Sequence, residues 1–171
     1  MKKPGANGFT LMEVMITVVI IGILASIAYP SYTNYVTAAR RSDATINLTQ
    51  LAAQQEKFFT QCGGYAGGLN AGTARVCQTT LAPASGTIPA SSTSLTVAGT
   101  TRDGYYNIAI TPDPGPGGFL NGYTLTAAPV ATSSQFAADN PKCTTITLTN
   151  TGAKGASGTD NGPNGGRCWK K

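Results

Sequence analysis

Hydrophobic and polar residues divide this chain into an apolar stretch, an amphipathic stretch and a mostly polar remainder. The 21 residues from Phe9 to Tyr29 contain a single charged side chain, Glu13. A helix of that length spans roughly 30 Å, the thickness of a bilayer's hydrocarbon. Lys2 and Lys3 precede the stretch, and the positive-inside rule places that end in the cytoplasm. The pattern predicts a membrane-inserted helix with its N-terminus inside.

The helix is expected to continue past Pro30 with a different character. Apolar side chains and one glutamine recur at helical spacing and form a packing stripe: Ala44, Leu48, Leu51, Gln55, Phe58 and Phe59. Charged and amide side chains form a polar face: Arg40, Arg41, Asp43, Asn47, Gln50, Gln54 and Lys57. Cys62 and the two glycines after it end the helix.

The residues after Cys62 carry strand and turn signals. Residues 63–94 show little periodicity and predict a long connecting loop, and 95–97 is a candidate short strand. Residues 105–110, 122–127 and 143–149 predict three antiparallel strands, with a turn at 112–118, whereas 152–166 is polar and aperiodic. Three or four antiparallel strands on the helix stripe give an α+β fold, a long N-terminal helical spine packed on a small antiparallel sheet head.

Composition argues against catalysis. The chain has no histidine, and only 11% of its residues are charged. It therefore lacks a Ser-His-Asp triad, a Cys-His dyad and an HExxH zinc site. The seven acidic residues are spread singly and offer no carboxylate cluster for a metal centre. We expect a structural or binding protein with no enzyme activity, no cofactor and no metal.

A secretory signal peptide is the alternative interpretation of the apolar stretch, with Ser26-Ile27-Ala28 as its cleavage site. Glu13 opposes it, because a carboxylate at mid-membrane costs on the order of 2.5–3.5 kcal/mol. A disposable signal has no use for such a group. A retained helix can use it as the partner of a buried cation.

The run Gly8-Phe9-Thr10-Leu11-Met12-Glu13, the apolar helix after it and Pro30 resemble the processing signature of type IV prepilins. The resemblance implies cleavage after Gly8 by a membrane-embedded prepilin peptidase and N-methylation of Phe9. It also implies the type IV pilin fold, an inner-membrane precursor handled by an assembly machinery, and an extracellular pilus on the bacterial surface.

The resemblance divides the chain into four parts. Residues 1–8 are the leader peptide, 9–30 the transmembrane and polymerisation half of the helix, and 31–61 its amphipathic half. Residues 62–171 form the head, with an αβ-loop, the antiparallel sheet and a disulfide-bounded C-terminal loop.

Assembly is expected to depend on Phe9 and Glu13. An amine and a carboxylate among apolar helices are each costly alone and tolerable when paired, so the Phe9 amine of one subunit and Glu13 of its neighbour would fix their register. A local role for Glu13 at the helix N-terminus is the alternative. Gly22 and Pro30 weaken the helix, and in related pilins the stretch between them unwinds within the filament. A rigid, gently bent helix is the alternative.

Four cysteines in an exported domain favour two disulfides, with three pairings open. We predict Cys62–Cys77 and Cys143–Cys168, because each bridge ties an irregular segment to a regular element. Loops of about 15 and 25 residues contribute roughly 3 kcal/mol each in the chain-entropy model. No Cys-x-x-Cys spacing supports zinc, and the single carboxylate in 160–165 is too little for calcium.

Candidate DNA contacts gather near the C-terminus: Arg167, Trp169, Lys170 and Lys171, with Lys142 and Lys154 nearby if the last disulfide forms. Cations beside a stacking aromatic suit nucleic acid. The pattern around Cys143 and Cys168 is similar to minor pilins that act as DNA receptors in natural transformation. A solvated basic terminus is the alternative.

Three functions follow from these features. The first is a structural subunit that polymerises with copies of itself into a pilus for adhesion, twitching motility or DNA uptake. The second is a minor pilin that acts as a DNA receptor. The third is a type II secretion pseudopilin, against which the C-terminal disulfide counts.

Overall fold

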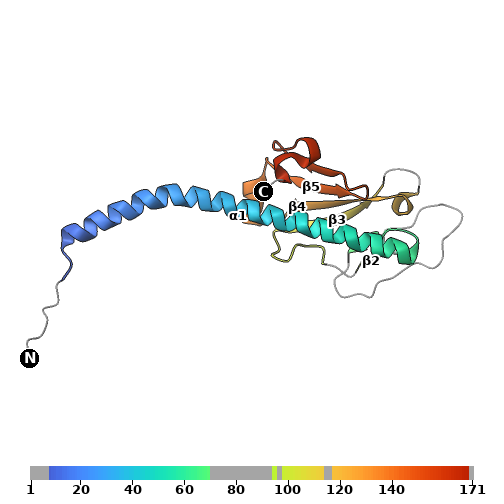
Figure 1. Ribbon diagram of the computed structural model, residues 1–171, viewed down its shortest axis with the longest axis horizontal. Helices are drawn as coiled ribbons and strands as arrows, with labels where there is room; N and C mark the ends of the chain where they lie inside the picture. The colour runs from blue at the N-terminus through green and yellow to red at the C-terminus, as the bar shows by residue number, and fades with distance from the viewer. Residues whose placement is uncertain (1–7, 70–93, 96–97, 114–116, 170–171) are drawn as a thin grey trace, which may run out of the picture. The chain divides into compact units, whose positions relative to one another are not determined.

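The computed structural model describes residues 8–69, 94–95, 98–113 and 117–169, which Figure 1 shows in colour. The chain divides into two compact units, Met1–Val36 and Thr37–Lys171. The elements in chain order are α1 (Leu11–Cys62), β1 (Gly68–Leu69), β2 (Ser94–Leu95), β3 (Tyr106–Pro112), η1 (Gly118–Leu120), β4 (Tyr123–Pro129), α2 (Ser134–Asp139), β5 (Thr145–Thr149), β6 (Lys154–Ser157) and η2 (Pro163–Cys168).

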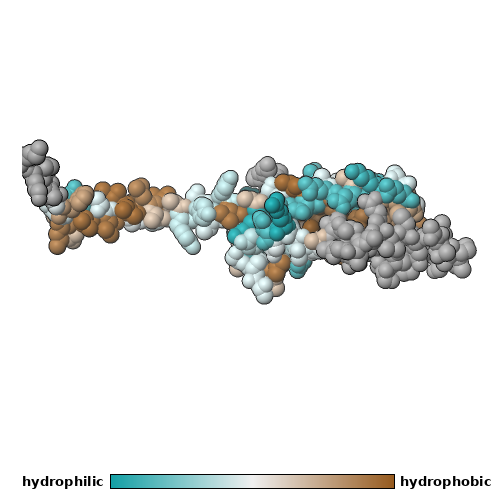
Figure 2. Space-filling model, turned by 90° about the horizontal axis from the view of Figure 1, so that it is seen from below, coloured by the Kyte–Doolittle hydropathy of each residue, from teal (hydrophilic) through white to brown (hydrophobic). Residues whose placement is uncertain are grey.

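The first unit contains the apolar half of α1. The helix is long and apolar enough to cross a membrane, and none of its most apolar stretch is buried within the chain; Figure 2 shows it largely in the colour of hydrophobic residues. The hydroxyls of Thr17, Ser26 and Thr33 donate to carbonyl oxygens three residues earlier, at 2.8, 2.7 and 3.0 Å. These groups therefore need no hydrogen bond from lipid.

Helix α1 is continuous through Gly22 and Pro30. The proline removes one backbone donor from the helix interior, yet the residues on both sides of it are helical. Unwinding between the two residues within a filament stays a prediction.

Four antiparallel strands form the sheet of the second unit, in the order β3-β4-β5-β6. The first three confirm the predicted strands. Ile108 of β3 lies opposite Ala127 of β4, and Leu125 of β4 lies opposite Leu148 of β5. Burial alternates along β4, so one face of this strand packs into the core, as period-two patterning requires.

Residues 152–166, which are polar and aperiodic in sequence, contain a strand and a short helix. Strand β6 pairs with β5, placing Lys154 opposite Leu148 and Gly155 opposite Thr147, and η2 follows. The sequence Lys-Gly-Ala-Ser carries no apolar alternation. Pairing with a formed neighbour, rather than intrinsic preference, makes this segment a strand.

Two further elements depart from the sequence prediction. Strand β1, within the expected connecting loop, pairs in parallel with β2, and the short strand expected at 95–97 begins at Ser94, while 96–97 lie outside the described residues. The sequence pattern does not predict α2, because six residues are too few for helical periodicity. The Ser133 hydroxyl caps α2 by accepting from the Phe136 N–H.

The predicted packing stripe of α1 is confirmed: Ala44, Leu48, Leu51, Gln55 and Phe58 are buried. They belong to one core with apolar side chains of the sheet, including those of Tyr106, Leu125 and Ile146. Figure 1 shows the corresponding part of α1 running along the strands. The core is thus built between the helix stripe and the inner face of the sheet.

Arg41 does not lie on a solvated polar face as the sequence suggested. Its Nε donates to Oδ1 of Asp139 at 2.6 Å, and Asp139 is fully buried. The Tyr106 hydroxyl donates to the other oxygen of Asp139. The Gln135 amide nitrogen lies 2.9 Å from that oxygen and 3.0 Å from the Tyr106 hydroxyl. We call these four side chains the buried polar network.

Arg40, also predicted on the polar face, connects α1 to Tyr105 and Ser134 at the edge of the buried polar network. It donates to the Tyr105 hydroxyl at 2.9 Å and to the Ser134 hydroxyl at 3.0 Å, and its guanidinium stacks over the Tyr105 ring. The buried polar network and Arg40 together fasten α2 and the start of β3 to α1. Desolvation, together with the hydrogen bond to Asp139, raises the pKa of Tyr106 well above its ordinary value.

Candidate nucleic-acid interface

The C-terminal loop, Cys143 to Cys168, contains Lys154 and Arg167, and Lys142 and Trp169 directly flank it. The Cys143–Cys168 disulfide closes it, with Cα atoms 5.7 Å apart, which confirms one of the two predicted bridges. Both cysteines are buried. Cys77, the predicted partner of Cys62, lies outside the described residues. The loop carries β5, β6 and η2 between two covalently joined ends.

A run of left-handed backbone turns the end of this loop back on itself. Asn164, Gly165 and Gly166 have φ values of 56°, 80° and 57°. A Cβ at Gly166 would collide with the Asp160 carbonyl oxygen, so glycine is required there for close approach as well as for its φ. The turn brings the Arg167 N–H to 3.1 Å from that same oxygen.

Asp160 is held from the other side by Lys142. The Asp160 N–H donates to the Lys142 carbonyl oxygen at 2.9 Å, and Lys142 directly precedes the disulfide residue Cys143. The side chains of Lys142 and Arg167 are exposed, and that of Asp160 is half-buried. One end of the C-terminal loop therefore presents two cations and a carboxylate on a hydrogen-bonded backbone frame.

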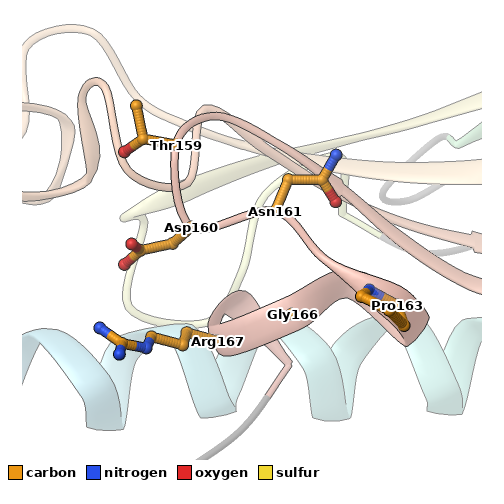
Figure 3. Close-up of a pocket in the computed structure, with 6 residues that line it drawn as sticks. All are labelled: Thr159, Asp160, Asn161, Pro163, Gly166 and Arg167. Carbon is orange, nitrogen blue, oxygen red and sulfur yellow. The ribbon is translucent and has the colours of Figure 1, made fainter.

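A polar hollow of about 540 Å³ opens at this end of the loop, and we call it the loop hollow. Six residues line it: Thr159, Asp160, Asn161, Pro163, Gly166 and Arg167. In Figure 3 the side chains of Asp160 and Arg167 extend to the same side, while Pro163 lies at the opposite end. The hollow thus offers a carboxylate, an amide and a guanidinium to a polar ligand.

Trp169 and Lys154 form a separate group on the loop. The indole N–H donates to the Gly155 carbonyl oxygen at 2.8 Å, and the Lys154 Nζ lies 5.0 Å from the centre of the ring. The ring is half-buried. Lys154 is exposed on the outer strand β6, and the fixed indole ring attracts its ammonium group.

The predicted DNA contacts therefore gather on one loop in two places. Lys154 lies opposite Leu148 at one end of the β5–β6 pair, whereas Thr145, near Lys142, lies opposite Ser157 at the other. The Asp160 backbone links Arg167 to Lys142 by hydrogen bonds, whereas the Trp169 ring lies next to the Lys154 ammonium group. Lys170 and Lys171 lie outside the described residues.

Sequence reasoning singled out the run from Asp160 only as a weak calcium candidate and missed its part in the loop hollow. Across residues 8–69, 94–95, 98–113 and 117–169, no three His, Cys, Asp or Glu side chains gather as metal ligands do. The glycine pair at 165–166, flanked by Asn164 and Arg167, is the signal that could have indicated a tight return of the chain.

The N-terminal motif has a local structure of its own. The Thr10 hydroxyl accepts from the Glu13 N–H at 3.3 Å, and its carbonyl accepts from the same group at 3.1 Å. This places Thr10 as the cap and Glu13 in the first turn, where the helix dipole favours a carboxylate. Phe9 is 82% exposed. No side chain in the described part of the chain pairs with the Glu13 carboxylate.

Comparison with protein families gives two matches. The model described as "Type IV minor pilin ComP, DNA uptake sequence receptor" matches residues 30–147, more than half of the chain. The model of the prokaryotic N-terminal methylation motif matches residues 3–29. The first match ends within β5, so most of the C-terminal loop lies beyond it.

Individual proteins are similar over shorter segments. The type IV major pilin protein PilA of Myxococcus xanthus is 43% identical over 63 residues, 37% of this chain and 29% of that protein. The fimbrial protein EcpC of Eikenella corrodens is 52% identical over 44 residues, 26% of this chain and 29% of that protein. A solved type IV pilin from Shewanella oneidensis is 19% identical, with a TM-score of 0.39, over 69% of this chain and 89% of that one.

Proposed function

The chain belongs to the type IV pilin family described as minor pilin ComP, DNA uptake sequence receptor, and from that premise we propose that it is a minor pilin that binds DNA. As a type IV pilin it is an inner-membrane protein before assembly and part of a pilus afterwards. Pilins are structural proteins rather than enzymes. Cleavage after Gly8 by prepilin peptidase, methylation of Phe9 and passage through the assembly machinery belong to the same proposal.

The C-terminal loop is the observation that carries DNA binding. Lys154 and Arg167 are exposed on a loop whose ends are joined by a disulfide, and Lys142 is exposed directly before it. Phosphate binding requires such cations, and each one that meets a phosphate releases a counterion. A loop fixed by the disulfide and by the Trp169 indole presents them with little ordering cost.

A structural pilus subunit is the second candidate function. Relatives named as major pilins share short segments with this chain, and the unpaired Glu13 carboxylate favours subunit packing. The two candidates differ in abundance: a major subunit is the main protein of sheared fibres, and a minor pilin is a small fraction of them. The pseudopilin alternative has the Cys143–Cys168 bridge against it.

Duplex DNA binding measured against salt concentration tests the proposal. The full chain in mild detergent should bind, with log K falling linearly as log salt rises. Lys142→Ala and Lys154→Ala should each weaken binding to every sequence alike and reduce the salt slope by about 1. Lys57→Ala, an exposed cation on α1, is the matched control and should bind as the unsubstituted chain does.

Absence of DNA binding would contradict the proposal. A correctly folded chain that binds no duplex at low salt is not a DNA receptor, and the structural-subunit function would then stand. Quantifying the chain in sheared fibres provides the independent measurement of abundance.

A further inference from the structure

We propose that Asp160 and Arg167 act together as a base-pair reader that recognises a G·C pair in the major groove of DNA. This inference rests on the proposed function and deepens it. It separates residues that hold the phosphates, Lys142 and Lys154, from residues that determine the sequence bound. The loop hollow is the part of the C-terminal loop that meets the base edges.

The two side chains are placed by one frame. The Arg167 N–H donates to the Asp160 carbonyl oxygen at 3.1 Å, and the Asp160 N–H donates to the Lys142 carbonyl oxygen at 2.9 Å. Cys168, next to Arg167, is bonded to Cys143, next to Lys142. Both side chains line the loop hollow and extend to the same side of it in Figure 3.

Among the residues that the structure describes, neither the Asp160 carboxylate nor the Arg167 guanidinium forms an ion pair. The contrast is Arg41–Asp139, a 2.6 Å pair buried in the core. Two opposite charges that line the same hollow, and form no ion pair with the described residues, are available to a ligand that presents both acceptors and a donor.

The edge of a G·C pair has that pattern. In the major groove guanine presents the N7 and O6 acceptors, which a guanidinium fork meets with two hydrogen bonds. Cytosine presents its N4 donor on the same edge, and a carboxylate accepts from it. One arginine and one carboxylate on neighbouring backbone segments match both halves of the pair.

Asp160 also argues for base contact rather than phosphate contact. The Asp160 carboxylate, on the same backbone frame as Lys142 and Arg167, repels phosphates and lowers affinity for DNA in general. That cost is offset only where a base donor, such as cytosine N4, meets it. Asp160 therefore penalises other sequences while tolerating the matching one, which is how repulsive elements create specificity.

Selection from a pool of randomised duplex DNA tests the inference with the full, disulfide-bonded chain in mild detergent. The unsubstituted chain should enrich duplexes that share a G·C pair at one fixed position. Arg167→Lys keeps the charge and loses the fork, so the preference for guanine should fall by roughly 5- to 100-fold with an unchanged salt slope. Asp160→Asn should let other bases replace cytosine and should raise affinity for unselected DNA.

Arg102 and Asp103 provide the matched controls. They are an exposed arginine and aspartate just before β3, and β3 lies at the opposite edge of the sheet from β6. Arg102→Lys and Asp103→Asn should enrich the same duplexes as the unsubstituted chain. Thermal melting and the mass of the intact disulfide identify any variant that fails to fold.

The outcomes separate this inference from the function on which it rests. If the unsubstituted chain binds DNA and enriches no sequence, or if Arg167→Lys and Asp160→Asn enrich the same sequence as the unsubstituted chain, the base-pair reader is wrong and DNA binding stands. If the unsubstituted chain binds no duplex, both proposals fail.

Discussion

A single polar residue in the apolar stripe of α1 shows how one side chain can organise a distant segment. Gln55 is fully buried, and its amide nitrogen donates to the Ala66 carbonyl oxygen at 2.9 Å. Its amide oxygen accepts from the Ala66 N–H at 2.8 Å. The side chain thus pairs with a backbone as a neighbouring strand would, and it ties the segment after α1 to the core.

Gln55→Ala is predicted to lower the free energy of unfolding by about 2–4 kcal/mol, because it leaves both buried backbone groups of Ala66 without partners. Chemical denaturation of the full chain in detergent, followed by tyrosine circular dichroism, measures the change. Gln50→Ala, at an exposed position on the same helix, should change it by less than about 0.5 kcal/mol. Equal effects of the two substitutions would contradict this role of Gln55.

At the scale of elements, short segments are held by contacts rather than by their own propensity. Helix α2 has six residues, and the buried polar network joins it to α1 and β3 through Arg41, Asp139, Tyr106 and Gln135. Burying the Asp139 carboxylate in this way is tolerated because both of its oxygens accept hydrogen bonds. Strand β6 is likewise defined by its ladder with β5 and by the Trp169 indole.

The raised pKa of Tyr106, caused first by desolvation and then by the hydrogen bond to Asp139, predicts loss of stability in alkali. Above about pH 10 the unfolded chain releases this proton and the folded chain keeps it. The unfolded state then binds fewer protons, so the free energy of unfolding falls as pH rises, by at most about 1.4 kcal/mol per pH unit for this group.

Tyr106→Phe tests this slope. It removes the hydroxyl, so the free energy of unfolding should be lower near neutral pH and should fall less steeply between pH about 10 and 12. Tyr32→Phe, which removes an exposed hydroxyl from the first unit, serves as the control and should keep the original slope. Identical alkaline slopes in Tyr106→Phe and the unsubstituted chain would show that Tyr106 does not carry the effect.

At the scale of the whole molecule, the two units face different environments. The first unit exposes its large apolar side chains, among them Val18, Ile21 and Leu24 at 62%, 64% and 62%. The second unit buries its own core and exposes the C-terminal loop. Exposed apolar area of this extent is stable in lipid or against other apolar helices, which is where a pilin resides before and after assembly.

Glu13→Val should leave cleavage and membrane insertion intact and remove the chain from assembled fibres. The substitution makes the helix more apolar, which favours insertion, while it removes the carboxylate proposed to pair with the Phe9 amine of a neighbour. Immunoblots of membranes and of sheared fibres measure both effects. Thr17→Val, on the same helix, should assemble normally. Recovery of Glu13→Val in sheared fibres at normal yield would exclude the pairing.

Features that depend on local pattern could be predicted from the amino-acid sequence. A 21-residue stretch in which Glu13 is the single charged side chain predicts a membrane helix, and the spacing of Ala44, Leu48 and Leu51 predicts the buried stripe. The alternating strands follow in the same way, and the four cysteines predict two disulfides, among which the Cys143–Cys168 pairing is confirmed by the structure. Periodicity and cysteine count are properties of the amino-acid sequence and do not depend on how the chain is arranged in space.

The contacts between polar residues, by contrast, become visible only in the folded chain. Arg41 and Asp139 are separated by 98 residues, and nothing in either neighbourhood indicates that they pair. Asp160, Arg167 and Lys142 come together through left-handed turns and a disulfide, whereas Trp169 joins Lys154 instead. Sequence periodicity does not predict which charged side chains contact one another. Those contacts depend on distances between segments that are set only when the backbone folds.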